Sequence, residues 1–365
     1  MTEITSRRRL KARSEFIPFL HNKAGYDVIP AAIVPGVTMQ RLRQFLLVVS
    51  ISLAFAMSAA SIAQSQTSQP WPQRPVRFII PLGPGSGVDI TARLLADKLA
   101  AKWGQPVVVE NRPGGDAFLA ITAVLSARDD HVLLFAPAST FTAHTLLHEK
   151  LPYDPKELTP IARVTNTLIA LGVPADLNVS SVKELVAKIR AEPGKLNYAS
   201  VTGANDLLFA AFLKTEKLDM AKVPYKDTVQ AINDLAEGRI HAFVGAYAIM
   251  RPRVQAGKVK VIALTNRQHA KALDDIPTAS EAGFKALEFD GLVGLLGPRE
   301  VPPPVRDRIA ADVRAIVSDP EVDSKLSATG QVVNPGTPAE FAAALEDQLR
   351  TVKQIGETLG IKPAQ

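Results

Sequence analysis

The chain has 365 residues, 47% of them hydrophobic and 21% charged, which is enough for about two domains of ordinary size. It has no cysteine, which excludes disulfides, thiolate metal sites and cysteine nucleophiles. From Gln64 onward 34 basic residues stand against 33 acidic ones, so the net charge of +6 arises almost wholly upstream and nucleic acid is excluded as a partner.

An export signal precedes this near-neutral body. Arginines lead into the apolar run Phe45–Met57, and small residues follow it up to Ala63. This order predicts a signal peptide over about 39–63, cleaved after Ala63 into the periplasm. The run is shorter than the roughly 20 apolar residues of a membrane span. Residues 1–63 are therefore interpreted as an N-terminal extension and signal peptide, with translation starting at Met1 or at Met39.

Strands and helices alternate after a Pro-rich lead-in. The first unit is expected to hold strands at 76–80, 106–110 and 131–135 and helices at 89–102 and 116–127. Strands separated by helices of this length predict right-handed βαβ units and a parallel sheet.

A second unit begins near Gly172. A capping box at Ser181 and Glu184 opens its first helix. Its expected strands are 196–200, one near Val223, 240–244 and 258–265, and its helices are 182–190, 206–216 and 229–237. A late strand over 288–296 is expected to return to the first sheet beside a parallel partner, followed by helices 304–317 and 338–359. Lobe one would then comprise 70–172 plus 287–365, and lobe two 173–286.

The turn from Leu82 to Asp89 joins the first strand to the first helix and is rich in glycine. Unpaired amides and the positive end of the helix converge there, which favours an anion. An NAD-dependent oxidoreductase would use the Gly83–Gly87 turn with Glu110 on the ribose. Two residues disfavour this oxidoreductase alternative. Val88 occupies the position of the motif's third glycine, and Pro84 has no backbone N–H to donate to a phosphate. A tight turn without a ligand is the remaining alternative.

The sequence offers little for catalysis. No G-x-S-x-G elbow exists because Pro84 lies two positions before Ser86, and no H-E-x-x-H motif is present. His144 and His148 are four apart on an expected helix, but no third ligand is near them, so they are interpreted as surface histidines without a metal. We therefore expect neither an enzyme nor a cofactor.

Eight phrases of the chain resemble the Bug family, the periplasmic receptors of tripartite tricarboxylate transporters. The resemblance covers nearly all of residues 71–361. The phrases are Trp71–Pro81, the Gly85-x-Gly87-x-Asp89 turn, Gly104–Gly114, Leu151–Pro155, Lys195–Ser200, Val223–Lys226, Ala256–Lys258 and Ile276–Gly283. They occur in the family's order.

The resemblance implies an α/β fold of the type 2 periplasmic-binding-protein kind. Two lobes with central sheets would be joined by two crossings, with a ligand cleft between them. Two turns would hold a ligand carboxylate through amides and hydroxyls, assisted by hydroxyls after the third strand. The implied ligand-binding residues are Leu82, Gly85, Ser86, Gly87 and Asp89 in the first turn, Ser139 and Thr140, and Ser200, Thr202, Gly203, Asn205 and Asp206 in the second turn. The second turn departs from the family's Gly-x-Gly-Thr pattern.

The sequence thus predicts a monomeric receptor that captures a small organic carboxylate for the membrane subunits of a transporter. A protein that presents its ligand to a membrane sensor is an alternative, and the oxidoreductase is another.

The first testable prediction concerns export. The mature protein should begin at Gln64, because the small residues at Ser61 and Ala63 follow the apolar run as in a cleavage site. N-terminal sequencing of exported protein tests this, and any residue upstream of Phe45 in the mature product would contradict it.

Overall fold

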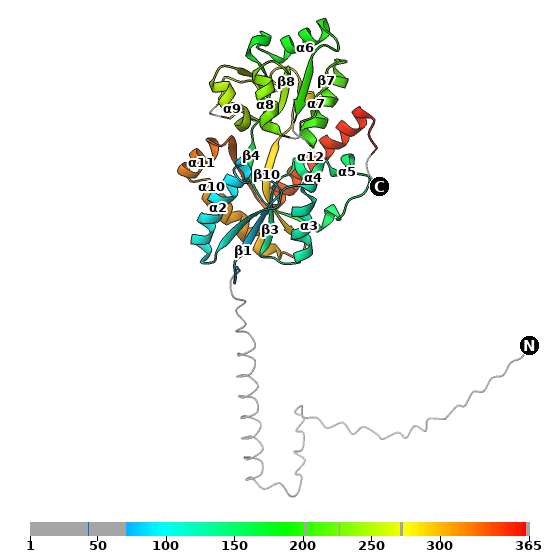
Figure 1. The fold of residues 1–365 in the computed structure, drawn as a ribbon. Coiled ribbons are helices and arrows are strands. Elements are labelled where there is room, and N and C mark those ends of the chain that lie inside the picture. The colour runs from blue at the N-terminus through cyan, green and yellow to red at the C-terminus, as the bar shows by residue number, and fades with distance from the viewer. Residues whose placement is uncertain (1–42, 44–70, 201–202, 226, 271–272, 363–365) are drawn as a thin grey trace, which may run out of the picture. The chain divides into compact units, whose positions relative to one another are not determined.

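The computed structural model describes residues 43, 71–200, 203–225, 227–270 and 273–362 (Figure 1). The described residues from 71 to 362 form one compact unit. The predicted signal peptide, apart from Arg43, and its cleavage site lie outside the described residues. Among the helices that the structure describes, none combines the length and the apolar character that crossing a membrane requires.

A six-stranded sheet forms the first lobe, in the order β11-β4-β10-β3-β1-β2. Strands β1 (Val76–Ile80), β2 (Val107–Asn111) and β3 (Val132–Pro137) are parallel. Helices α2 (Gly87–Trp103) and α3 (Phe118–Ala127) connect them. This part matches the βαβ units that the sequence predicted.

The other half of this sheet is antiparallel, which corrects the prediction. Strand β10 (Gly291–Pro298) runs antiparallel to both β3 and β4 (Leu158–Thr167), and β11 (Gln331–Gly336) runs antiparallel to β4. The expected parallel partner for the late strand was wrong. Gly291 pairs with Thr167, the last residue of β4. The chain thus re-enters the sheet at the edge where β3 and β4 end, so it must run the opposite way.

The first crossing is a single residue. Strand β5 (Ile169–Pro174) follows β4 directly, with only Leu168 between them, although β5 belongs to the second sheet. The Leu168 amide donates to the Gly330 carbonyl at 2.9 Å, and its carbonyl accepts from the Tyr247 amide at 2.8 Å. The sequence predicted neither strand, and the expected boundary at 172/173 falls inside β5.

A five-stranded sheet forms the second lobe, in the order β7-β6-β8-β5-β9. Strand β6 is parallel to β7 and β8, whereas β5 is antiparallel to β8 and β9. Its strands are β6 (Asn197–Ser200), β7 (Ala221–Lys222), β8 (Ala242–Ala246) and β9 (Val259–Leu264), and its helices are α6 (Val182–Ala191), α7 (Ala204–Thr215), α8 (Thr228–Ala236) and α9 (Tyr247–Gln255).

Short helices and the C-terminal helices complete the fold. They are α4 (Ser139–Thr142), α5 (His144–Leu147), α10 (Pro303–Val317), α11 (Pro320–Ser327), α12 (Pro338–Leu359) and the 3-10 turns η1 (Gly115–Ala117), η2 (Pro155–Glu157), η3 (Ala175–Leu177) and η5 (Lys285–Leu287). Figure 1 shows the two sheets in separate halves of the body, with α12 reaching toward α7.

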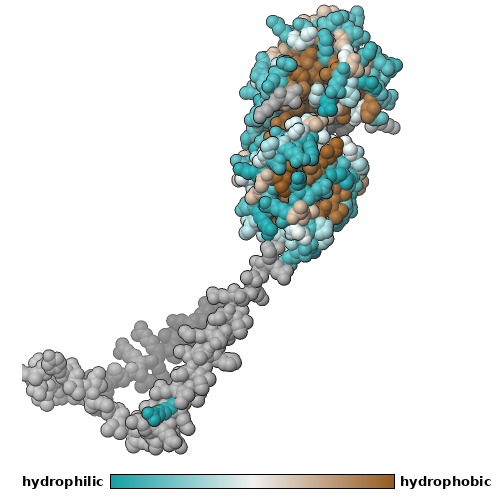
Figure 2. All heavy atoms as spheres, turned by 90° about the vertical axis from the view of Figure 1, so that its left-hand side faces the viewer, coloured by the Kyte–Doolittle hydropathy of each residue, from teal (hydrophilic) through white to brown (hydrophobic). Residues whose placement is uncertain are grey.

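Both faces of the first sheet are buried, as the continuous apolar strands require. Phe78 faces the core shared with α2 and α10, whereas Ile79 faces the core shared with α3 and α12. On the face shown in Figure 2, hydrophilic side chains cover most of both lobes and apolar groups show between them.

Helix α12 contacts both lobes. Its start is fixed by a capping box between Thr337 and Glu340, and Phe341 is fully buried against the first sheet. Further along the same helix, Val352 and Ile355 pack with apolar residues of α7 in the second lobe. The lobes therefore share an apolar cluster beside the crossings.

Replacing Gly294 with alanine should destabilise the protein. A Cβ on Gly294 would lie 2.5 Å from the Ala162 carbonyl and 2.5 Å from the Phe341 ring. Overpacking of this kind costs about 1–3 kcal/mol of unfolding free energy, which urea denaturation measures. Gly83→Ala is the control, because no atom lies within 4 Å of a Cβ there. Equal stability of the two variants would contradict the packing described for α12 on β10.

Candidate functional site

The first turn is organised around one buried carboxylate. Asp89 is only 2% exposed, and its oxygens accept from the Gly85 amide at 2.9 Å, the Asn111 Nδ2 at 2.8 Å and the Arg93 Nε at 3.1 Å. Asn111 also donates to the Leu82 carbonyl at 3.0 Å. The predicted residues Leu82, Gly85 and Asp89 are therefore brought together, but Asp89 binds the turn itself.

This network sets the charge of Asp89. Burial raises the pKa of a carboxyl group, but the bonds from Arg93, the Gly85 amide and Asn111 together outweigh it and lower the pKa of Asp89. The carboxylate is thus ionised and fully engaged. Sequence reasoning missed Asn111, although it ends the second strand where its side chain can reach back to the first turn.

The donors that remain lie at the start of α2. The Ser86 hydroxyl accepts from the Asp89 amide at 3.2 Å as the helix N-cap, which leaves its own proton free to be donated. Gly87 and Val88 occupy the first helical positions, where amides have no acceptor within the helix. The Gly85 amide is already taken by Asp89. Three donors therefore lie at consecutive positions at the start of α2, as in anion sites at helix N-termini.

Gly87 is held closely from behind. A Cβ on Gly87 would lie 3.0 Å from the Gln331 Nε2 and 3.0 Å from the Thr329 carbonyl. Gln331 is 1% exposed and accepts from the Thr165 hydroxyl at 2.8 Å. The first residue of β11 and the segment before it therefore fix the position of the turn, and no short-range signal in the sequence indicated that contact.

The second turn is held by an ion pair. The Ser200 hydroxyl donates to Asp206 at 2.6 Å, and the Lys222 Nζ donates to the other oxygen of Asp206 at 2.5 Å. Because its proton is used, Ser200 can accept from a ligand but cannot donate to a carboxylate. Lys222, which the sequence analysis did not select, neutralises Asp206. The predicted residue Thr202 lies outside the described residues.

The second turn lies against the first lobe. Gly203 has φ +88°, and a Cβ there would lie 3.6 Å from the Ser139 carbonyl. Ser139 and Thr140 begin α4, directly after β3, and both are half-buried. Since β3 and β1 are neighbouring parallel strands, both turns of the first lobe open at the same edge of the sheet. Predicted residues from both lobes are thus brought together.

Buried polar atoms without partners occur at the same contact. Asn205 at the start of α7 is 6% exposed, and its Oδ1 has no hydrogen-bond partner among the described residues. The Thr142 hydroxyl of α4 is also buried without one. Such groups cost free energy unless water or a ligand satisfies them. Of the predicted residues, Asn205 has the clearest unused bonding capacity.

The interpretation of both histidines as surface residues was wrong for His144. His144 is fully buried and its Nδ1 lies 2.8 Å from the Tyr153 hydroxyl. Its Nε2 has no hydrogen-bond partner among the described residues and lies 4.0 Å from the Asp116 Oδ2. Burial lowers the pKa of His144 and raises that of Tyr153. His148 is half-exposed and bonds Asp116 at 2.6 Å. The four-residue spacing could not show that α5 turns its first residue into the core.

Glu110, the expected ribose-binding acid of the oxidoreductase alternative, is already paired. Its oxygens accept from Arg77 at 2.5 and 2.8 Å, and Arg112 adds a contact at 3.3 Å. The bonds from Arg77 lower the pKa of Glu110. A carboxylate used by two arginines is poorly placed to bind a ribose, so this arrangement does not favour the dinucleotide function.

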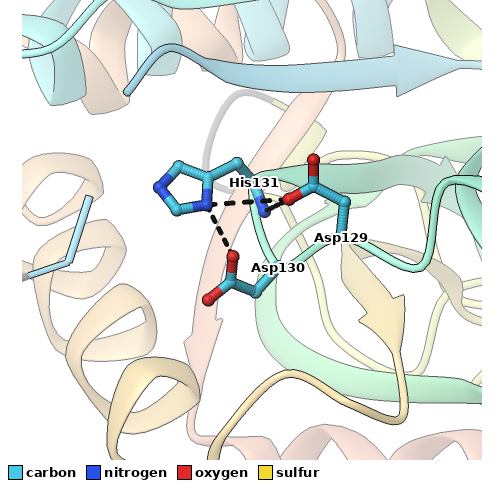
Figure 3. Close-up of side chains that lie close together, drawn as sticks. All are labelled: Asp129, Asp130 and His131. Atoms are coloured by element: carbon cyan, nitrogen blue, oxygen red, sulfur yellow. Dashed lines mark hydrogen bonds and ion pairs between the residues drawn. The ribbon is translucent and has the colours of Figure 1, made fainter. Parts of the chain in front are cut away.

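Asp129, Asp130 and His131 lie close enough to share a cation (Figure 3). However, Arg74 binds both oxygens of Asp129, at 2.6 and 2.8 Å. The His131 Nδ1 lies 2.6 Å from Asp130, and its Nε2 accepts from the Gln73 amide at 3.3 Å. Both ring nitrogens and the Asp129 carboxylate are therefore used, and the cluster fastens the segment before β1 to the start of β3.

Comparisons with known proteins agree with this architecture. Residues 91–361 match the family described as tripartite tricarboxylate transporter family receptor. A UPF0065 protein of Bordetella bronchiseptica is 28% identical over 327 residues, covering 89% of this chain and 96% of that protein. An R. palustris protein solved with adipate is 26% identical, with a TM-score of 0.71 over 80% of this chain and 99% of that chain. The periplasmic binding protein BugD is 26% identical, with a TM-score of 0.67 over 81% of this chain and 100% of that chain.

Asp89→Asn should destabilise the protein at neutral pH by about 1–3 kcal/mol, because it removes a charged acceptor from three donors. The pKa of folded Asp89 lies below its ordinary value of 3.8. Its stabilisation is therefore complete above that value and is lost as the pH falls through the folded pKa. Urea denaturation from pH 7 to pH 3 measures the effect. The gap between wild type and variant should narrow toward acid, whereas the exposed control Asp97→Asn should show little gap at any pH.

Proposed function

The chain belongs to the tripartite tricarboxylate transporter receptor family, as its motifs predicted, and we propose that it captures a small organic carboxylate for the membrane subunits of such a transporter. One observation carries the proposal: the turn at Gly203 in the second lobe meets Ser139 of the first lobe at the sheet edge where the amides of Gly87 and Val88 open. A ligand at this edge would touch both lobes.

The chemistry of this edge suits a carboxylate. The donors are the Ser86 hydroxyl and two helix-start amides, which carry no net charge. Neutral dipoles can hold an anion without leaving a cation unpaired in the empty cleft. The acids nearby do not oppose it, because Asp89 is paired with Arg93 and Asp206 with Lys222.

The class of ligand is proposed from the relatives. The similar R. palustris protein was solved with adipate, which carries a carboxylate at each end. In this chain one carboxylate would meet the first turn, and Asn205 with its unpartnered Oδ1 would bond a hydroxyl, a protonated group or a water beyond it. Asn205 would therefore help to discriminate between carboxylates.

We further propose that the mature protein acts in the periplasm as a monomer and releases its ligand unchanged. The family is one of transport receptors, and the signal at 39–63 would export the chain. The carboxylates Asp89, Glu110 and Asp206 are tied up in hydrogen bonds and ion pairs, so none is poised as a general base.

A screen of monocarboxylates, dicarboxylates and tricarboxylates by thermal shift tests the proposed function, with adipate as the reference probe. A true ligand at 100 times its Kd adds about 2.7 kcal/mol of stability. Gly87→Val should weaken binding by tenfold or more, since the added side chain presses on Thr329 and Gln331 and disturbs the amides that bind the anion.

Gly83→Val is the matched control in the same turn, because a Cβ at Gly83 has open space around it. Circular dichroism would show that both variants fold. Unchanged affinity in Gly87→Val would move the site elsewhere, a chemically altered ligand after incubation would overturn the receptor function, and the absence of binding by any carboxylate would overturn the ligand class.

A further inference from the structure

The second crossing between the lobes is the segment that leads from β9 back to β10. A cavity of about 380 Å³ lies where this segment passes α12. It is lined by β4, by the start of β10, by the segment around Arg267 and Asp290, and by α12. None of the predicted ligand-binding residues lines it. Its volume falls in the range of pockets that hold small molecules.

One side of the cavity presents a cation without an acidic partner. Arg163 of β4 is half-buried, and its Nε donates to the Asn334 carbonyl at 2.9 Å. No described carboxylate lies within ion-pair distance of it. Gly336 leaves the space that its guanidinium fills, since a Cβ there would lie 3.2 Å from Arg163 Nε. Burial lowers the pKa of Arg163, as expected for a cation lacking a counter-charge.

The other side presents acceptors. Gln348 of α12 is 5% exposed, and its Nε2 donates to the Asp290 carbonyl at 3.0 Å. That bond fixes the orientation of the amide, so the atom without a hydrogen-bond partner among the described residues is the acceptor Oε1. Asp290 also lines the cavity. Its Oδ1 accepts from the Arg267 amide at 3.1 Å, and its Oδ2 lies 3.9 Å from the Arg267 Nε, which leaves Oδ2 able to accept from a ligand. Burial raises the pKa of Asp290.

Asn166 stands between the two sides. It is 7% exposed, and within the described part of the chain its Oδ1 has no hydrogen-bond partner. An amide side chain can donate and accept, so it can serve either end of a ligand. Two side chains more than nine-tenths buried thus line this cavity with unused hydrogen-bonding capacity.

From this arrangement we propose that the cavity is a second binding site, for a small zwitterion such as a short α-amino acid. The ligand carboxylate would pair with Arg163, and its ammonium would donate to Gln348 and Asp290.

A simpler ion fits less well. An anion alone would face Gln348 Oε1 and the Asp290 carboxylate, and a cation alone would face Arg163. The remaining charges of the wall are already matched, since Arg267 lies 2.9 Å from Glu288 and 2.6 Å from Asp347. A ligand whose own charges cancel therefore adds no net charge to a wall that is itself balanced.

The test is calorimetric titration of the mature chain with glycine and L-alanine, alongside acetate and methylamine as the two half-ligands. Glycine and alanine should bind, and in the Gly87→Val variant, whose proposed carboxylate site is impaired, each half-ligand should bind at least tenfold more weakly than glycine. Arg163→Met and Gln348→Leu should each weaken glycine binding by roughly tenfold or more, and Arg163→Lys should restore part of it. Arg314→Met and Gln354→Leu are the matched controls. They remove the same charge and the same amide from residues that do not line the cavity, so they should leave glycine binding unchanged.

The first turn separates this site from the proposed carboxylate site. Gly87→Val should leave glycine binding intact, so failure at one site does not imply failure at the other. Glycine binding that is lost in Gly87→Val but kept in Arg163→Met would overturn the proposal. So would acetate binding as tightly as glycine to the Gly87→Val variant, whose proposed carboxylate site is impaired, or no binding of either amino acid to a folded wild-type chain. Thermal melts of Arg163→Met and Gln348→Leu would show that weaker binding does not reflect unfolding.

Discussion

The buried carboxylate of Asp89 is the constraint on which the first lobe's part of the site depends. A glycine-rich turn has many backbone conformations available, and the bonds from Gly85, Asn111 and Arg93 select one of them. The same bonds join the end of β1, the end of β2 and the start of α2. Because the Gly85 amide donates to Asp89, it is not available to an anion. An anion at this turn must therefore bind the amides of the residues that follow.

The sequence was sufficient for elements set by local pattern. Apolar runs bounded by turns predicted β1 to β3 and their helices, and the family motifs predicted the two-sheet fold, which the similar structures confirm. Strand β4 was not predicted from the sequence, because Pro160, Arg163 and Asn166 interrupt its apolar pattern. Asn166 is buried and Pro160 and Arg163 are half-buried, so none of the three lies on a solvent-exposed face of the strand. The direction of β10 depends on where the chain returns, which no local pattern encodes.

The candidate site was predictable in outline but not in hydrogen bonding. Glycines and hydroxyls before a helix predicted which segments come together. The acceptor that each hydroxyl or amide proton bonds depends on neighbours that are distant in sequence. The Ser200 hydroxyl donates its proton to Asp206, and Lys222 pairs with the other oxygen of the same carboxylate. Gln331 supports Gly87 from a strand more than 240 positions away. Such contacts arise only when the sheets are assembled, and they decide which atoms remain for a ligand.

The single residue between β4 and β5 is a point about which the second lobe can rotate. Leu168 bonds Gly330 through its amide and Tyr247 through its carbonyl, so its two peptide groups are anchored on opposite sides of the joint. Strand β5 lies between β8 and β9, and a small torsion at Leu168 would carry the whole sheet with it. Displacement grows with distance from the joint. Fluorophores placed on α6, far from the crossing in Figure 1, would therefore report an angular change by energy transfer that labels near Tyr247 would barely register.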